Sequence, residues 1–177
     1  MFLACKCGET KVVELLLKHF NCEENGLNIK EKDRYTALMV ACKNGHKDVV
    51  QLLLDNSERN IDLNAQNNRG ETAFMFACKN GHKDVVQLLL DNLERNIDLN
   101  AKNNGGGTAF MLACAYGHKD VVQLLLEHSK KNIDLNAKSN GRVTAFMWAC
   151  RYGHKDVVKL LIELAICRCL RRLCTCE

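Results

Sequence analysis

The sequence predicts an all-α protein, an α-solenoid of stacked helix–turn–helix repeats with protruding hairpin loops. The main observation is internal repetition. The stretch TAFMFACKNGHKDVVQLLLDN starts at Thr72 and recurs with small changes from Thr36, Thr108 and Thr144, always 36 residues apart. A second observation is that the apolar residues of each copy fall at the i, i+3, i+4 spacing of a helix face. The composition, 47% hydrophobic and 26% charged, is ordinary for a globular chain.

The chain opens with a truncated copy of the repeat. It aligns with the later copies through Ala4, Cys5 and Gly8, but it begins inside the first helix. Because a terminal repeat ordinarily needs an intact polar outer face, we expect the chain to be a piece of a longer protein; an unusual natural start is the alternative. Residues 21–35 are polar and rich in turn-forming residues, which predicts a loop that leads into Thr36.

Each full repeat is predicted to begin its first helix at a threonine. The hydroxyl of Thr72, for example, can accept a hydrogen bond from a backbone N–H that has no partner within the helix. Phe74, Ala77 and Cys78 follow at the spacing of one helix face. Gly81 is expected to end this helix, since glycine adopts the left-handed conformation without strain.

The second helix of the repeat is predicted to start near His82. Asp84 lies in its first turn, where a negative charge complements the helix dipole. The helix carries a wide apolar face that a single repeat cannot bury, so stacked neighbours must cover it. In the second full repeat this face consists of Val85, Val86, Leu88, Leu89 and Leu90.

A polar connection follows each second helix. Asn96 is a candidate helix C-cap, and the alternation around Ile97 and Leu99 predicts a short extended piece. Residues 103–107, NNGGG, are expected to form a tight turn rather than a phosphate-binding loop, because no Lys-Ser or Lys-Thr pair follows. The predicted organisation is a repeat array over residues 1–166 and an atypical tail at 167–177. The array divides into a partial repeat 1–35 and repeats 36–71, 72–107, 108–143 and 144–166.

This pattern resembles the ankyrin repeat, whose unit reads G-x-T-P-L-H-x-A-A-x-x-G-H-x-x-V-V-x-L-L-L and ends in a D-x-N-A turn. The resemblance covers essentially residues 1–166 and implies a stack of about four and a half repeats that binds protein partners. The matching residues of one copy are Gly70, Thr72, Ala77, Gly81, His82, Val85, Val86, Leu88, Leu89, Asp98, Asn100 and Ala101.

The sequence departs from the family pattern in three ways. The usual Thr-Pro-Leu-His becomes Thr-Ala-Phe-Met or Thr-Ala-Leu-Met, and proline is absent throughout. The methionines Met39, Met75, Met111 and Met147 are therefore expected to replace an inter-repeat hydrogen bond by an apolar contact. The period exceeds the family's usual ~33 residues, which predicts a longer second helix or loop around residues 93–96. Arg34 and Arg142 replace the hairpin glycines Gly70 and Gly106, so those two turns are expected to differ in shape.

The chain has eleven cysteines, five of which occupy one position of the repeat. Helices of neighbouring repeats pack about 10 Å apart, whereas a disulfide needs Cα atoms within about 7 Å. We therefore expect free, buried thiols in this column and a reducing, intracellular environment such as the cytoplasm. The column consists of Cys5, Cys42, Cys78, Cys114 and Cys150.

We expect no enzyme activity, no cofactor and no metal. His46, His82, His118 and His154 recur at the turn between the helices, but at about 10 Å spacing they cannot share one metal ion, and no nucleophile recurs beside them. The tail could hold one zinc ion through four thiolates, although its C-x-C spacing is not that of common zinc sites; a reduced, frayed tail is the alternative. These four thiolates are Cys167, Cys169, Cys174 and Cys176.

The variation between copies predicts the binding surface. It collects at the end of the first helix and at the hairpin tip, which the ankyrin resemblance places on one concave face; neutral drift at exposed positions is the alternative. Tyrosine at several of these positions favours binding. The varying apolar column Val40, Phe76, Leu112 and Trp148 is interpreted as core. The candidate partner-binding residues are Tyr35, Lys43, Asn44, Arg69, Glu71, Lys79, Asn80, Tyr116, Arg151 and Tyr152.

The expected partner is a protein. The net charge of +4 is too small to indicate nucleic-acid binding. The sequence contains no apolar run of about 18 residues, so we do not expect a membrane partner. No small-molecule substrate is evident. An alternative is that the chain is the ankyrin part of a larger enzyme, channel or signalling receptor. The resemblance also implies that Asn64, Asn100 and Asn136 match the loop asparagine that cytosolic hydroxylases modify in ankyrin-like repeats.

Overall fold

The structure is a computed structural model that describes residues 1–19, 32–56, 61–128 and 133–174. These residues form α-helices and short 3₁₀ turns, and they contain no strand. The loop expected at residues 21–35 lies mostly outside the described residues. The helices are α1 (Phe2–Cys7), α2 (Thr10–His19), α3 (Ala37–Asn44), α4 (Lys47–Asp55), α5 (Ala73–Lys79), α6 (Lys83–Asp91), α7 (Ala109–Ala115), α8 (Lys119–Glu127), α9 (Ala145–Arg151) and α10 (Lys155–Cys174).

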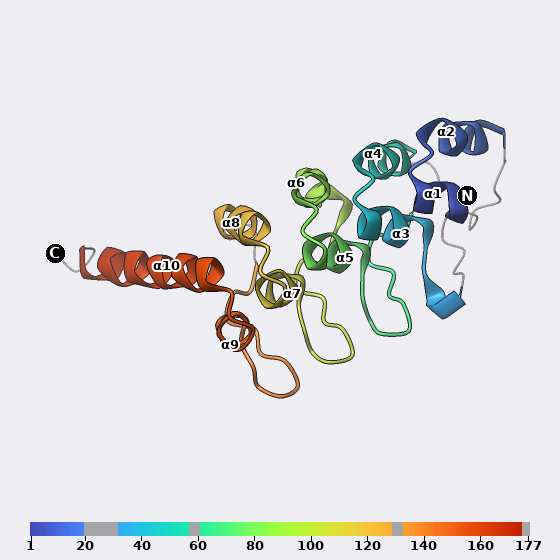
Figure 1. Ribbon diagram of the computed structural model, residues 1–177. Helices are drawn as coiled ribbons and strands as arrows, with labels where there is room; N and C mark the ends of the chain where they lie inside the picture. The colour runs from blue at the N-terminus through green and yellow to red at the C-terminus, as the bar shows by residue number, and fades with distance from the viewer. Residues whose placement is uncertain (20–31, 57–60, 129–132, 175–177) are drawn as a thin grey trace.

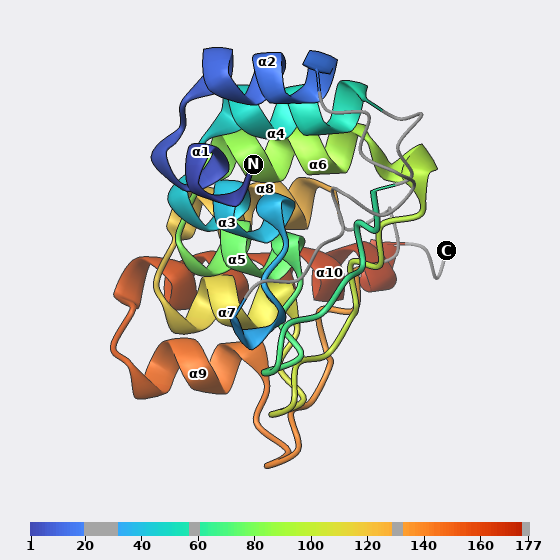
Figure 2. The same cartoon turned by 90° about the vertical axis from the view of Figure 1, so that its right-hand side faces the viewer.

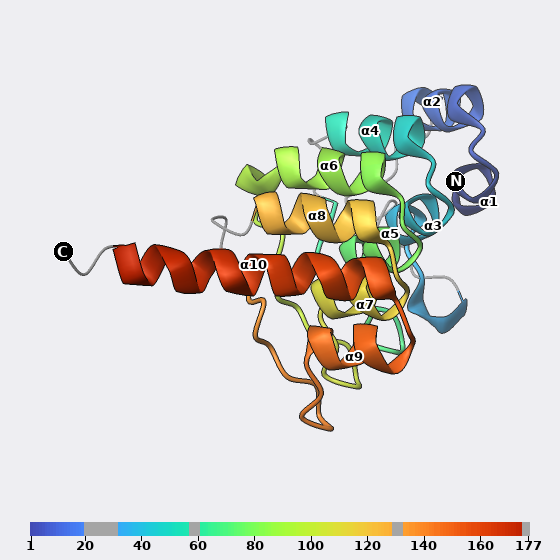
Figure 3. The same cartoon turned by 60° about the vertical axis from the view of Figure 1, so that its left-hand side comes forward.

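The helices stack in two layers, as Figure 3 shows. The first helices of the repeats, α1, α3, α5, α7 and α9, pack on one another in chain order, and the second helices, α2, α4, α6, α8 and α10, form the other layer. The connecting loops protrude from the side of the first-helix layer (Figures 1 and 2). The predicted all-α solenoid of helix–turn–helix repeats is therefore confirmed.

Each first helix begins at the predicted threonine. The threonine backbone is extended, and its hydroxyl oxygen accepts a hydrogen bond from the backbone N–H of the methionine three residues later at 3.2–3.4 Å. This bond satisfies one of the N–H groups that a helix start leaves unpaired. The four cap pairs are Thr36–Met39, Thr72–Met75, Thr108–Met111 and Thr144–Met147.

The methionines of the stack interior are buried, as expected for an apolar contact that replaces a polar one. Met39, Met75 and Met111 lie in the continuous core between the helix layers. Met147 contradicts the expectation, because its side chain is 54% exposed. No repeat follows it within the described residues, so no neighbour covers it.

A 3₁₀ turn accommodates the extra residues of the long repeat. Residues Leu93–Arg95 form this turn, and Asn96 ends it in the left-handed conformation (φ 62°), which confirms the predicted cap. Ile97 and Leu99 are buried as the alternation indicated, but they lie in loop rather than in a strand. The second helix itself keeps the same length in α4, α6 and α8.

The two hairpins without glycine behave differently from each other. Arg142 adopts φ 58°, close to the 72° of Gly70, and its backbone N–H donates to Ser139 as that of Gly70 donates to Asn67. The prediction of a different shape is therefore wrong for this hairpin. It is confirmed for the first one, where Asp33 and Arg34 both have positive φ and lie in or next to a 3₁₀ turn, Lys32–Arg34.

The last helix continues beyond the length of its counterparts. α10 runs from Lys155 to Cys174, so the domain boundary expected after residue 166 falls within it. Its basic and acidic residues interrupt the apolar ones. Among the residues that the structure describes, no helix combines the length and the apolar character that crossing a bilayer requires.

A histidine of each full repeat forms a hydrogen bond to the preceding repeat. His82 Nε2 donates to the backbone carbonyl of Lys43 at 2.9 Å, and the same bond recurs along the stack. Each histidine therefore serves one interface, in agreement with the structural role expected for the column. Within the described residues, no group of three His, Cys, Asp or Glu side chains could hold a metal ion. The other bonds are His46–Lys6, His118–Lys79 and His154–Ala115, at 2.8–3.0 Å.

Candidate protein-binding surface

The hairpin tips and the ends of the first helices meet at one surface, which we call the hairpin face. It contains a cavity of about 550 Å³ between the last two repeats. Both sets of residues predicted to vary contribute to its wall. The lining residues are Asn103, Gly105, Gly107, Met111, Leu112, Ala115, Tyr116, Ser139, Trp148, Tyr152 and His154.

Two tyrosines at helix ends border this cavity. Tyr116 and Tyr152 are the C-cap residues of α7 and α9, and their side chains are 53% and 55% exposed. A C-cap position directs the side chain away from the helix packing, which explains why large rings stay accessible there. Tyr152 stacks on Trp148 with the ring centroids 5.4 Å apart, and Tyr116 stacks on His118 at 6.5 Å. The rings are therefore held in place before any partner arrives.

Basic side chains lie over the aromatic rings of the hairpin face. Lys43 Nζ is 5.3 Å from the centre of the Tyr35 ring, and Lys79 Nζ is 5.6 Å from that of Tyr116. At the far end, the guanidinium carbon of Arg151 is 5.8 Å from the centre of the Trp148 ring. These distances fit cation–π contacts. The face therefore combines aromatic surface with positive charge along its length.

Glu71 corrects the predicted set of exposed contact residues. Its side chain is buried, and one carboxylate oxygen accepts from Lys79 Nζ at 2.8 Å while the other accepts from Asn67 Nδ2 at 3.3 Å. Burial lowers the pKa of Lys79, but the hydrogen bond and the charge of Glu71 outweigh it, so that the pKa of Lys79 is raised. Glu71 therefore holds the hairpin against the first helix and has little surface to offer a partner.

Of the other polar residues of the predicted set, Lys79 is half-buried and the rest are exposed, and the two asparagines also have structural bonds. Asn44 and Asn80 each donate from Nδ2 to the carbonyl four residues earlier, at 2.9 and 2.8 Å, and so close the end of their own helix. Arg69 is exposed at a hairpin tip, where its backbone N–H donates to Asn67 Oδ1 at 2.9 Å. Tyr35 is half-buried against Phe76, with ring centroids 5.3 Å apart.

Two residues of the cavity wall were interpreted as core from the sequence. Val40 and Phe76 are indeed buried, whereas Leu112 and Trp148 are only partly buried and line the cavity. The sequence feature that could have indicated this exposure is the glycine-rich hairpin tip, since Gly105 and Gly107 line the same cavity as Trp148. Glycine has no side chain to cover a neighbouring ring, so the aromatic surface stays open.

The cysteine column consists of free thiols, as predicted. Burial raises the pKa of Cys5 to about 11 and that of Cys114 to about 12, and it also raises the pKa values of Cys42 and Cys78. Cys150 contradicts the expectation of burial, because it is exposed at the end of the stack. The possible zinc ligands lie outside the description: the structure does not describe the side chains of Cys167, Cys169 and Cys174, nor any part of Cys176.

Comparison with known families agrees with the repeat geometry. A family model described as ankyrin repeats (3 copies) matches residues 1–103 and residues 93–171, which together span α1 to most of α10. Among curated proteins, no relative matches the chain.

Proposed function

The chain belongs to the ankyrin repeat family, and we propose that it binds a protein partner through the hairpin face, the concave face of the family's stacks. Ankyrin repeats are generally protein–protein interaction modules, and they are typically non-catalytic. A rigid stack presents residues from several repeats as one pre-organised surface, which reduces the entropy lost on binding. The free, largely buried thiols support an intracellular, reducing location.

The observation that carries the proposal is the pair of exposed tyrosines at the mouth of an apolar cavity. Tyr116 and Tyr152 both line the cavity together with Leu112, and Trp148 stacks on the second of them. Tyrosine and tryptophan dominate the binding energy of many interfaces because they bury a large area with few rotatable bonds. A cavity of this size accepts one or two apolar side chains of a partner.

The charged side chains of the hairpin face indicate the chemistry of that partner. The exposed cations Lys43, Arg69 and Arg151 line the hairpin face, while the carboxylate of Glu71 is buried against Lys79. Arg151 lies over Trp148 of the cavity wall, whereas Lys43 and Arg69 lie in earlier repeats of the same face. We infer that the partner contributes an acidic segment with an apolar or aromatic side chain that enters the cavity.

The proposal is tested by capturing binding partners on the full chain and on the double variant Tyr116→Ala/Tyr152→Ala. We expect the double variant to retain its helical circular dichroism and melting temperature but to lose at least about nine-tenths of the partner, as hot-spot truncation does. Raising the salt concentration from about 0.1 M to 0.5 M is expected to weaken capture by the wild type, because the cations are exposed.

The matched control is the double variant Lys83→Ala/Lys119→Ala. Both lysines are exposed at the starts of α6 and α8, in the second-helix layer. This variant should capture the partner as the wild type does. A partner that stays bound to the tyrosine variant and is lost from the lysine variant would place the interface on the second-helix layer instead.

A further inference from the structure

The outward surface of the last repeat exposes side chains that every earlier repeat buries. We call the surface formed by α9, α10 and the preceding loop the end face. Phe110 is 2% exposed, whereas its counterpart Phe146 is 43% exposed; Cys114 is buried, whereas Cys150 is exposed. Figure 3 shows that, among the described residues, no helix packs on this side of α9 and α10. The end face thus has the composition of an inter-repeat interface.

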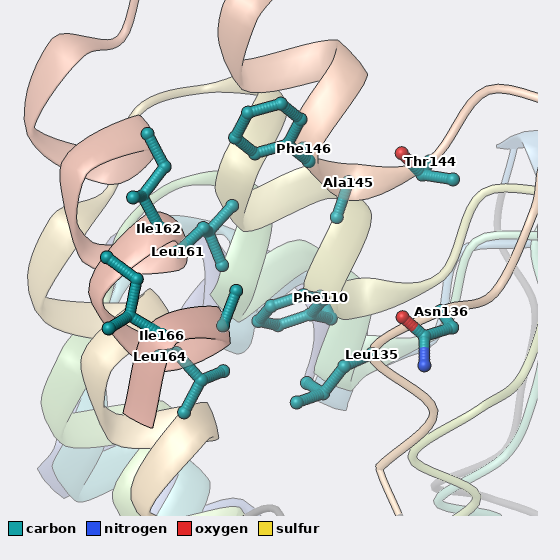
Figure 4. Close-up of a pocket in the computed structure, with 11 residues that line it drawn as sticks. Phe110, Leu135, Asn136, Thr144, Ala145, Phe146, Leu161, Ile162, Leu164 and Ile166 are labelled. Atoms are coloured by element: carbon teal, nitrogen blue, oxygen red, sulfur yellow. The ribbon is translucent and has the colours of Figure 1, made fainter. Parts of the chain in front are cut away.

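A groove of about 570 Å³ runs along the end face. In Figure 4 the side chains of Phe146, Leu161 and Ile162 converge on it from α9 and α10, and Leu135 and Asn136 border it from the loop. A second hollow of about 450 Å³ adjoins it through Ile162 and reaches Cys150 and Gly153 at the turn between the helices. Both hollows lie where a following helix pair would pack.

At the turn of the last repeat, the space beside the glycine is open, whereas a histidine ring of the next repeat fills it at the earlier turns. We call this space the histidine socket. At Gly8, Gly45, Gly81 and Gly117, an added Cβ would lie 2.4–2.6 Å from Nδ1 of the histidine of the next repeat, so glycine is required for the ring to fit. At Gly153, with the same positive φ, an added Cβ would meet nothing within 4 Å. The carbonyl of Arg151 stands where those of Lys43 and Lys79 accept a bond from the incoming imidazole.

The loop asparagines provide a second coupling point. Asn64 Oδ1 accepts from the backbone N–H of Asp98 in the next repeat at 2.8 Å, and Asn100 Oδ1 accepts from that of Asp134 at the same distance. Asn136 is the next residue in this series, and it borders the groove in Figure 4. A docked loop could therefore donate a backbone N–H to Asn136 in the same way.

The hairpins provide a third coupling point. The backbone N–H of Asn104 donates to the carbonyl of Arg69, and that of Asn140 donates to the carbonyl of Gly105, both at 3.0 Å. The next acceptor in this series is the carbonyl of Gly141, which is exposed at the tip of the last hairpin. The three acceptors Arg151, Asn136 and Gly141 are thus the repeat equivalents of residues that accept bonds at the preceding interfaces.

We propose that the end face docks a helix–turn–helix repeat of the same type that lies outside residues 1–177, with a histidine at its turn and an asparagine in its hairpin. A second copy of this chain is a poor match, because its first repeat has Glu9 after Gly8, where the other repeats have histidine after glycine. A carboxylate cannot donate to the carbonyl of Arg151 as an imidazole does. No residue that lines the groove or the hollow beside it also lines the cavity of the hairpin face.

A fluorescent synthetic peptide of residues 96–128 serves as the probe, because it contains one hairpin, one helix pair and His118. We expect saturable binding to the full chain, measured by fluorescence anisotropy, and at least about a five-fold slower alkylation of Cys150 in the complex. A peptide that carries His118→Ala should bind at least about five-fold more weakly, since it loses the bond to Arg151.

The variant Gly153→Asn tests the socket on the protein side. Asparagine tolerates a positive φ better than other side-chain-bearing residues, but its Cβ occupies the position of the imidazole. We expect unchanged circular dichroism and at least about a ten-fold loss of peptide affinity. Equal affinity of the wild-type and His118→Ala peptides, or of the wild type and Gly153→Asn, would overturn the proposal.

A tethered probe covers the case in which the free peptide is too disordered to bind. Joining residues 96–128 to the C-terminus of the full chain through a flexible Gly/Ser linker of about 20 residues raises the effective concentration to about the millimolar range. We expect Cys150 to be protected from alkylation in this fusion. It should not be protected in a second fusion in which only the tethered segment carries His118→Ala. No protection, or protection of the untethered chain with concentration-dependent dimerisation, would overturn the proposal, the latter in favour of a second copy.

Discussion

The imidazole ring of His118 lies against Gly81 of the preceding repeat, where a Cβ would be only 2.5 Å from Nδ1. On its other side, Nε2 donates to the carbonyl of Lys79 at 2.8 Å. In repeats 36–71, 72–107 and 108–143, the glycine and the histidine that follows it therefore contact two different neighbouring repeats. The glycine receives the next repeat, and the histidine contacts the previous one.

Gly81→Ala is expected to lower the free energy of unfolding by about 2–4 kcal/mol. The substitution combines the strain of a positive φ, about 1–2 kcal/mol, with a clash against His118 that displaces the ring from its bond. Urea denaturation followed by circular dichroism measures this loss.

Gly153→Ala is the matched control for this prediction. Its φ of 74° is nearly the same, but nothing lies within 4 Å of the added Cβ. We expect it to cost only the strain of about 1–2 kcal/mol. Equal losses in the two variants would show that the histidine ring yields freely.

His82→Ala is expected to destabilise the stack by about 1–3 kcal/mol. It removes the bond to the carbonyl of Lys43 and leaves a gap over Gly45. Thermal unfolding gives the comparison with His19→Ala, a residue exposed at the end of α2 and expected to change stability by less than about 0.5 kcal/mol. A loss of the same small size in both variants would contradict a structural role of the column.

Glu71→Ala is expected to cost about 1–3 kcal/mol of folding stability, because it leaves the partly buried ammonium of Lys79 and the amide of Asn67 without their acceptor. Arg69→Ala, two residues away and exposed, should change stability by less than about 0.5 kcal/mol. Chemical denaturation of the two variants side by side measures both. If Glu71→Ala left the folding stability unchanged, Glu71 would again be a candidate for contact with the partner.

The thiols of the repeat column are expected to react at very different rates. Iodoacetamide at pH 8 should modify Cys7 and Cys150, which are exposed, long before Cys42, Cys78 and Cys114. Burial shields the latter three from the reagent and raises their pKa values, so that few thiolates form. Peptide mapping by mass spectrometry after timed quenching distinguishes the sites. Rapid modification of Cys78 in the folded protein would contradict the packing.

The stack is expected to lose stability as the pH rises above about 9. A thiol with an ordinary pKa of 9.0 and a folded-state pKa of about 12, such as Cys114, contributes stability that is fully present below pH 9 and is lost as the pH approaches 12. The loss is about 1.4 kcal/mol per pH unit between the two values. Urea denaturation of the wild type at pH 8 and 10 measures it.

Cys114→Ala serves as the control for the alkaline prediction. The alanine cannot ionise, so the variant should lose about 1.4 kcal/mol less than the wild type between pH 8 and pH 10. Lysine and tyrosine titration affects both proteins alike and cancels in the difference. The same pH dependence in both proteins would mean that this thiol ionises as readily in the folded state as in the unfolded one.

The sequence by itself determined the repeat, the two helices of each unit, the threonine caps, the left-handed Asn96 and the free thiols. These features depend on spacing along a few neighbouring residues, so that a single copy contains the necessary information. Comparison between copies also pointed to the region of the hairpin face, because Tyr116 and Tyr152 occupy the repeat position that holds asparagine in the two preceding full copies.

The tertiary structure alone decided which of these residues a partner can reach. Glu71 occupies a variable hairpin position, yet it is buried, because the hairpin places it against Lys79 eight residues away, which is itself only partly exposed. Met147 and Cys150 carry the same repeat signature as their buried counterparts, but their exposure depends on what packs beyond them. A repeat encodes its own helices, whereas burial is a property of the contact between repeats, and only the assembled stack defines that contact.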